Sequence, residues 1–153
     1  MKKFFIVLGI IFAVLLAIGA TGIGVVVMRG NALDKQSKAY ADDTIHAIVD
    51  GWNGRELLQR ASPEFKKIAT QQQIDQQFQR FSAAFGRLQK LEPAHGQSVM
   101  SATTLSGGTI KAEYATRATF EKGEARIQLD LIKHGDQWQI LGFFFKPPEL
   151  PAR

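Results

Sequence analysis

The sequence predicts an α+β protein in which an N-terminal transmembrane helix precedes three helices packed on a curved, four-stranded antiparallel meander. Three observations support this fold class. Residues Phe4–Met28 form a run of 25 positions without a charged side chain. Apolar residues then recur every three or four positions, which is typical of helices, and in the last third they alternate, which is typical of strands.

The uncharged run, Phe4–Met28, is long enough to cross a bilayer. At 1.5 Å per residue a helix of this length reaches roughly 37 Å, more than the ~30 Å of a hydrocarbon core. A cleaved secretory signal is the alternative, because Lys2 and Lys3 precede the run and Ala20-Thr21-Gly22 could serve as a cleavage site. Cleavage there would leave the apolar segment 23–28 as the new terminus, so we expect an uncleaved anchor over residues 1–29.

Small side chains recur along one side of the predicted transmembrane helix. They are Gly9, Ala13, Ala17, Ala20 and Gly24. Such a seam lets two helices approach closely, although an anchor rich in glycine and alanine shows it without any helical partner.

Charge and cysteine content limit location and partners. Positive residues flank both ends of the run, so the positive-inside rule only slightly favours one orientation of the helix in the membrane. The short N-terminal tail is typical of a signal anchor, which predicts a single-pass protein of the bacterial inner membrane with a periplasmic C-terminal domain.

Beyond residue 29 the chain has 16 Lys and Arg against 14 Asp and Glu. This balance excludes the basic footprint of a nucleic-acid binder, and the absence of cysteine excludes disulfides and a lipidated cysteine.

The rest of the chain divides into a polar linker (30–37), a domain (38–146) and a proline-rich tail (147–153). A first helix starts at Lys38 and is ended by Asn53-Gly54. Its buried face comprises Tyr40, Thr44, Ile45, Ile48, Val49 and Trp52.

A short helix is expected over residues 55–60, and Ser62-Pro63-Glu64 has the composition of a new helix start. Thr70 caps a longer helix whose glutamines form its solvent-exposed face, and Pro93–Gly96 ends the helical half of the chain. The apolar stripe of this helix comprises Ile74, Phe78, Phe81, Phe85 and Leu88.

The alternating region predicts four strands, at 97–105, 109–121, 124–133 and 137–145. A two-residue turn at Lys122-Gly123 would pair Phe120 with Ala125 and Tyr114 with Leu131, which places the apolar residues of both strands on one face. These inward positions include no carboxylate or histidine.

A second turn at Gly135-Asp136 would direct Trp138, Ile140 and Phe144 inward. The same register directs an apolar stripe outward on the last strand, beside Ile132 of the preceding strand. The interface candidates are therefore Ile132, Leu141, Phe143 and Phe145. The cover for this stripe could be the chain's own first helix, a partner subunit or another protein.

The order of elements resembles the nuclear transport factor 2-like superfamily, which also contains ketosteroid isomerase-like enzymes. The residues that carry the resemblance are Trp52, Gly54, Leu57, Leu58, Ser62-Pro63-Glu64-Phe65, Gly135-Asp136, Trp138 and Ile140. The resemblance implies a cone-shaped α+β roll over residues 38–146. With its anchor, the chain also looks like small inner-membrane envelope proteins of Gram-negative bacteria, and its layout is similar to that of assembly subunits of type IV secretion systems.

Few residues of the sequence suggest chemistry. Enzymes of the resembling group place an acid or base inside the cone, and no such group faces inward here. Three residues are candidates for a ligand pocket: His46, Tyr114 and Trp138. The histidine spacings match no zinc pattern, and no cofactor motif occurs, so neither a metal nor a cofactor is predicted.

We therefore expect a non-catalytic, membrane-anchored envelope protein whose domain mediates protein–protein association, with a homodimer or an envelope-complex partner. The alternative is a binding module for a small apolar ligand or, less in keeping with the residues, an isomerase- or hydrolase-like enzyme that uses the cavity of the cone.

Overall fold

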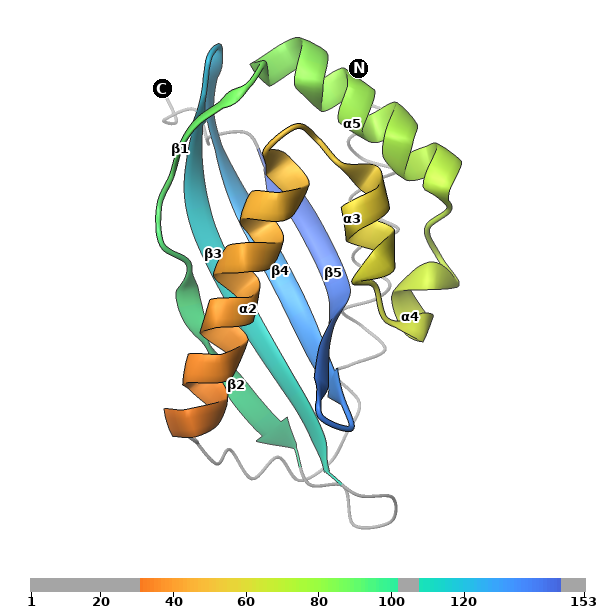
Figure 1. The fold of residues 1–153 in the computed structure, drawn as a ribbon, viewed down its shortest axis with the longest axis vertical. Coiled ribbons are helices and arrows are strands. Elements are labelled where there is room, and N and C mark those ends of the chain that lie inside the picture. The colour runs from red at the N-terminus through yellow and green to blue at the C-terminus, as the bar shows by residue number, and fades with distance from the viewer. Residues whose placement is uncertain (1–30, 102–107, 147–153) are drawn as a thin grey trace, which may run out of the picture.

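The computed structural model describes residues 31–101 and 108–146. Within them, helices α2 (Asn31–Val49), α3 (Gly54–Gln59), α4 (Pro63–Lys66) and α5 (Gln71–Phe85) precede a five-stranded sheet (Figure 1). The strands are β1 (Leu88–Leu91), β2 (His95–Ser101), β3 (Thr109–Phe120), β4 (Gly123–His134) and β5 (Gln137–Lys146).

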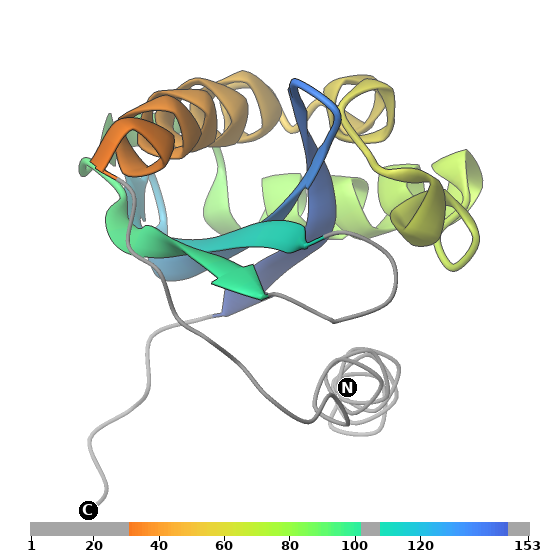
Figure 2. The same ribbon diagram turned by 90° about the horizontal axis from the view of Figure 1, so that it is seen from below.

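The sheet is antiparallel, and its strands lie in the order β1-β3-β4-β5, with β2 paired to β3. The helices lie on one side of it (Figure 2). We call the side that they cover the inner face and the opposite side the outer face. The predicted α+β class, with helices packed on an antiparallel sheet, is confirmed. No helix among residues 31–101 and 108–146 is long and apolar enough to cross a membrane. The predicted anchor with its small-residue seam, Gly30 and the proline-rich tail lie outside the described residues.

Helix α2 begins at Asn31, so the prediction of a linker up to residue 37 was wrong. Two carboxylates explain the early start because they fix the first half of the helix to the edge of β2. Asp34 accepts a hydrogen bond from the Ser98 amide (2.8 Å), and Asp42 accepts one from the Ala94 amide (2.7 Å). Eight helical residues and four strand residues both span about 12–13 Å, so the two contacts match in spacing.

The end of α2 also differs from the prediction. The helix stops at Val49, and Gly51 (φ 101°) and Trp52 (φ 54°) reverse the chain. Asn53 does not end this helix; its side chain caps α3 instead, accepting hydrogen bonds from two amides of the first turn. A Cβ on Gly54 would lie 2.5 Å from Asp75 Oδ1 and 2.9 Å from Ile74 Cγ2 of α5, so a larger residue there would displace these side chains.

Helix α5 confirms the predicted Thr70 cap and the buried stripe of Ile74, Phe78 and Phe81. It ends earlier than expected, however, at Gly86, which has a φ of 76°. Leu88 therefore belongs to strand β1 and not to the helix. A sheet of five strands results, where four were predicted.

The β3–β4 hairpin has the predicted faces but a different register. Phe120 pairs with Gly123 and Tyr114 with Leu129, a shift of two residues from the prediction. The turn is Glu121-Lys122, and backbone bonds to the α5–β1 connection hold it: Glu121 N donates to Arg87 O and Lys122 N donates to Phe85 O, both at 3.0 Å. Because the shift is even, the same side chains still point inward.

The β4–β5 hairpin has the predicted turn, and Gly135 there has a φ of 60°. Leu131 pairs with Ile140 as predicted, but the register then shifts between Asp130 and Leu131, so that Leu129 pairs with Phe143 and Ile127 with Phe145. This bulge at Leu141 reverses the faces of the rest of β5.

The bulge makes the prediction for the three consecutive phenylalanines wrong. Phe143 and Phe145 point inward, and Phe144, which was expected in the core, lies on the outer face opposite Gln128. The inward pair joins an aromatic cluster at one end of the core. Its members are Trp52, Phe78, Phe81, Phe85, Phe120, Phe143 and Phe145.

Candidate interaction surface

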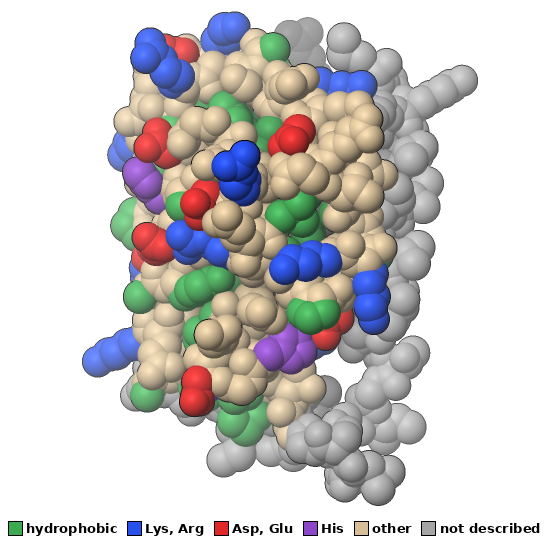
Figure 3. Space-filling model, turned by 45° about the vertical axis from the view of Figure 1, so that its right-hand side comes forward, with side chains coloured by type: hydrophobic (Ala, Val, Ile, Leu, Met, Phe, Trp, Pro, Cys, Tyr) green, Lys and Arg blue, Asp and Glu red, His purple; other side chains and the backbone are tan. Residues whose placement is uncertain are grey.

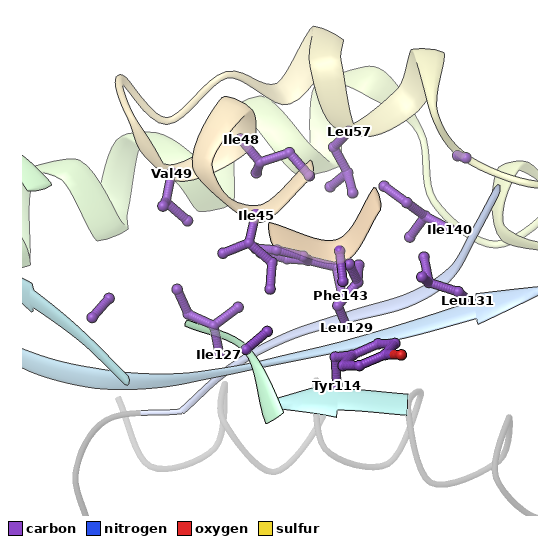
Figure 4. Packing of buried hydrophobic residues seen from close by; sticks show 14 of the residues in the cluster. Ile45, Ile48, Val49, Leu57, Tyr114, Ile127, Leu129, Leu131, Ile140 and Phe143 are labelled. Carbon is purple, nitrogen blue, oxygen red and sulfur yellow. The ribbon is translucent and has the colours of Figure 1, made fainter. Parts of the chain in front are cut away.

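Packed aliphatic side chains fill the centre of the inner face. Those with no exposed area are Ile45, Ile48, Val49, Ile127, Leu129, Leu131 and Ile140. Figure 4 shows the α2 side chains pointing toward those of β4 and β5. Burying each such side chain stabilises the fold by about 1.5–3 kcal/mol, so this region acts as core.

Tyr114, a pocket candidate, is committed to the helix above it. Its hydroxyl shares a 2.7 Å hydrogen bond with Ser37 Oγ and donates to the backbone oxygen of Asp34 at 3.1 Å. Burial raises the pKa of this hydroxyl, although the Ser37 contact acts in the opposite direction. The side chain is 1% exposed, so its role is to join β3 to α2.

The other two pocket candidates do not converge with Tyr114. His46 is exposed on the outside of α2. Trp138 faces inward, but it pairs with Lys133, four residues along β4 from the Leu129 that pairs with Tyr114. That offset corresponds to about 13 Å along the strand, which is too far for one small ligand to contact both side chains.

A shallow open groove of about 510 Å³ lies between the α2–α3 turn and α5. Its floor includes Trp52 and Phe78, and Asp75 stands at its side. None of the three pocket candidates lines it. Within the described ranges, no three histidine, aspartate or glutamate side chains gather closely enough to hold a metal ion.

The interface candidates also separate. Phe143 is 6% exposed, and Phe145 packs 4.5 Å from Phe81 between ring centroids, so both belong to the core. Ile132 lies on the outer face beside Gln139, as predicted, but is itself buried. Leu141, at the bulge, is half-buried. The predicted apolar stripe therefore does not exist as a continuous surface.

Charged residues dominate the outer face. They alternate with buried residues along β3 and β4, which fixes their direction. The exposed members are Lys111, Glu113, Arg117, Glu124, Arg126 and Lys146. Their grouping depends on strand pairing, so only a correct register could have revealed it.

The opposite side of the molecule carries charges differently. Over α3, α4 and α5, acidic and basic side chains are interspersed (Figure 3). Several are paired with the opposite charge, for example Arg60 with Asp43 at 2.8 Å and with Glu56 at 3.1 Å. This is the pattern of a solvated surface, in contrast to that of the outer sheet face.

Comparisons with known proteins give no relative: no family model matches the chain, and neither a curated protein nor a solved structure is significantly similar to it.

Proposed function

We propose that this chain is a non-catalytic, membrane-anchored protein of the bacterial envelope whose domain binds another protein through the outer face of its sheet. One observation carries the proposal. No described helix covers the outer face (Figure 2), and among the described residues no ion pair joins the charged side chains of that face to one another. Exposed, unneutralised charge on a rigid sheet suits recognition of a partner with complementary charge.

The membrane anchor and the periplasmic location are predictions from the sequence. The uncharged run ends at Met28, and α2 begins only three positions later. A nuclear transport factor 2-like roll, the finer description of the fold that we propose, agrees with the long antiparallel strands and the helices packed on one face.

A photo-crosslinking experiment in intact cells tests the association surface. Benzoylphenylalanine is placed in the full chain at Gln128, in the middle of the outer face, or at Gln72, an exposed position on α5. We expect a discrete adduct of higher mass from Gln128 and little from Gln72. Equal yields from both positions, or none from Gln128, would refute the outer face as the association surface.

Fusions to the C-terminus test the location. Alkaline phosphatase is active only outside the cytoplasm, and a fluorescent protein that folds in the cytoplasm reports the opposite orientation. We expect phosphatase activity in the membrane fraction. Fluorescence alone would reverse the orientation, and a mature N-terminus near Ile23 would show that the apolar run is a cleaved signal.

A ligand-binding module is the second candidate, and Trp138 is the observation in its favour. Its indole Nε1 is buried and has no hydrogen-bond partner within the described residues. Since an unpaired buried donor costs about 1–3 kcal/mol, a small acceptor bound there would relieve the cost. The test uses a Trp52→Phe variant, in which Trp138 is the remaining tryptophan. If a ligand is bound, its removal by extraction with organic solvent should shift the fluorescence of Trp138. An unchanged spectrum would exclude this candidate.

A further inference from the structure

Strand pairing sorts the outer-face charges into rows of a single sign. One row crosses three strands and contains only cations: Arg117, Arg126 and Lys146. A second row contains the acids Glu113 and Asp130, which are opposite each other on β3 and β4. A row of uncharged residues lies midway between them and comprises Ala115, Gln128 and Phe144.

These rows are unfavourable in an isolated chain. Directly opposite side chains on antiparallel strands have Cβ atoms about 4.5–5.5 Å apart, and like charges there are destabilising. Within the described residues no ion pair neutralises Arg117, Arg126 or Glu113. Burial raises the pKa of the Asp130 carboxyl, and Glu113 adds to this, although the hydrogen bond from Gln128 Nε2 and the charges of Lys111 and Lys146 act in the opposite direction. Each row therefore gains from an opposite charge supplied by another molecule.

We propose that the partner is a second copy of this chain, packed outer face to outer face about a two-fold axis that runs along the row of Ala115, Gln128 and Phe144. Such an axis leaves each strand over its own counterpart but reverses its direction. A residue two positions to one side of the axis then faces the residue two positions to the other side. Arg117 thus meets the partner's Glu113, and Arg126 meets the partner's Asp130.

The next rows agree with the same axis. Lys111 lies four positions to one side, and on the other side Thr119 and Glu124 are paired four positions away. The two-fold operation places Lys111 over the partner's Thr119, one strand from the partner's Glu124. Packed sheets lie about 10 Å apart, a distance that facing lysine and carboxylate side chains can bridge. Every interaction occurs twice, as an isologous interface requires.

The axis keeps both β2 edges on the same side of the dimer, and the first turns of α2 are attached to that edge through Asp34 and Ser98. Because α2 runs along β2 and the axis reverses the strand direction, the two α2 N-termini lie at opposite ends of that side. The inference rests on the proposed function, because it assumes that the outer face is the association surface.

Cysteine crosslinking in membranes tests the geometry, since the chain has no cysteine of its own. Gln128→Cys in the full chain places a thiol beside the axis, and Gln72→Cys on α5 is the matched control. With a short bismaleimide we expect a covalent homodimer from Gln128→Cys and several-fold less from the control. A homodimer yield at Gln128→Cys no greater than the control's would overturn the proposal.

Charge reversal tests the pairing in the same Gln128→Cys background. Arg117→Glu places an acid against the partner's Glu113, and Glu113→Arg places two cations together, so each variant alone should lower the dimer yield about tenfold. Expressed together with different tags, the two variants become complementary and should form the mixed dimer at close to the original yield. Both side chains are exposed, and equal melting temperatures would show that folding is preserved. Unchanged yields from the single variants, or no recovery in the mixture, would overturn the pairing.

The photo-crosslinking at Gln128 separates this inference from the proposed function. An adduct with a different protein, and none between two tagged copies, would overturn the homodimer while leaving the outer face as an association surface. An adduct between copies that is abolished by both charge reversals supports both.

Discussion

The two long hairpins of the sheet share strand β4 and yet follow different rules. Strands β3 and β4 pair without interruption from Ile110 with Lys133 to Phe120 with Gly123. Strands β4 and β5 change register at Asp130 and Leu131. The first hairpin therefore keeps its apolar residues on one face throughout. In the second hairpin, the apolar residues of β5 before and after Leu141 would lie on opposite faces if the strand were regular.

The bulge thus serves the core. Ile140 and Phe143 are three positions apart, an odd spacing that would place them on opposite faces of a regular strand. One extra residue, Leu141, brings both to the inner face. On the outer face the ring of Phe144 then lies over Gly142, where a Cβ would come within 2.8 Å of it. Local irregularity can therefore be what a well-packed core requires.

Single truncations should distinguish the neighbouring phenylalanines. Phe143→Ala removes a side chain that is 6% exposed and should lower the free energy of unfolding by about 3–5 kcal/mol. Phe144→Ala, on the outer face, should cost clearly less, about 1–2 kcal/mol. Chemical denaturation of both variants provides the comparison, and the reverse order would mean that β5 follows the regular register.

The two turns should respond differently to alanine. Gly135 has a φ of 60°, so Gly135→Ala should cost about 1–2 kcal/mol through backbone strain, although the site is open. Gly123 has no such conformation, and a Cβ there would meet Phe85 at an ordinary 3.9 Å. Gly123→Ala should therefore leave the melting temperature nearly unchanged. A loss at Gly123 as large as at Gly135 would contradict this account of the turns.

A pH series should reveal the smallest effect. Glu121 in the β3–β4 turn accepts a hydrogen bond from the Arg87 amide (2.9 Å), and this bond, which outweighs desolvation, together with the Arg87 charge lowers the pKa of the carboxyl. A lowered pKa stabilises the fold above the unfolded-state pKa, and this contribution is lost as pH falls through the folded value. Wild type should melt above Glu121→Gln at neutral pH, and the difference should close in acid. A difference independent of pH would exclude the charge as its cause.

The hairpins also show how far sequence reasoning reached. It assigned the inward residues of β3 and β4 correctly because an error of two residues does not change the face. It missed the Glu121-Lys122 turn because contacts from Phe85 and Arg87, distant in sequence, hold that turn in place of a glycine. It missed the bulge because alternation cannot show an inserted residue.

The candidate site was less predictable than the fold. Tyr114 and Trp138 were correctly placed inward, but a hydrogen bond to Ser37 could not be foreseen for the tyrosine. The rows of like charge were hidden because a row exists only across strands. Arg117 and Arg126 are nine positions apart in sequence and become direct neighbours through pairing alone.

The two carboxylates that fix α2 to β2 have a mechanical consequence. A pull on the N-terminus along the helix axis would load the Asp34–Ser98 and Asp42–Ala94 contacts together, in shear, because their spacings on the helix and on the strand match. Contacts loaded in parallel share the force, whereas contacts opened one after another each bear all of it. Tension that arrives from the N-terminal side would therefore pass into the edge of the sheet before it could peel the helix away.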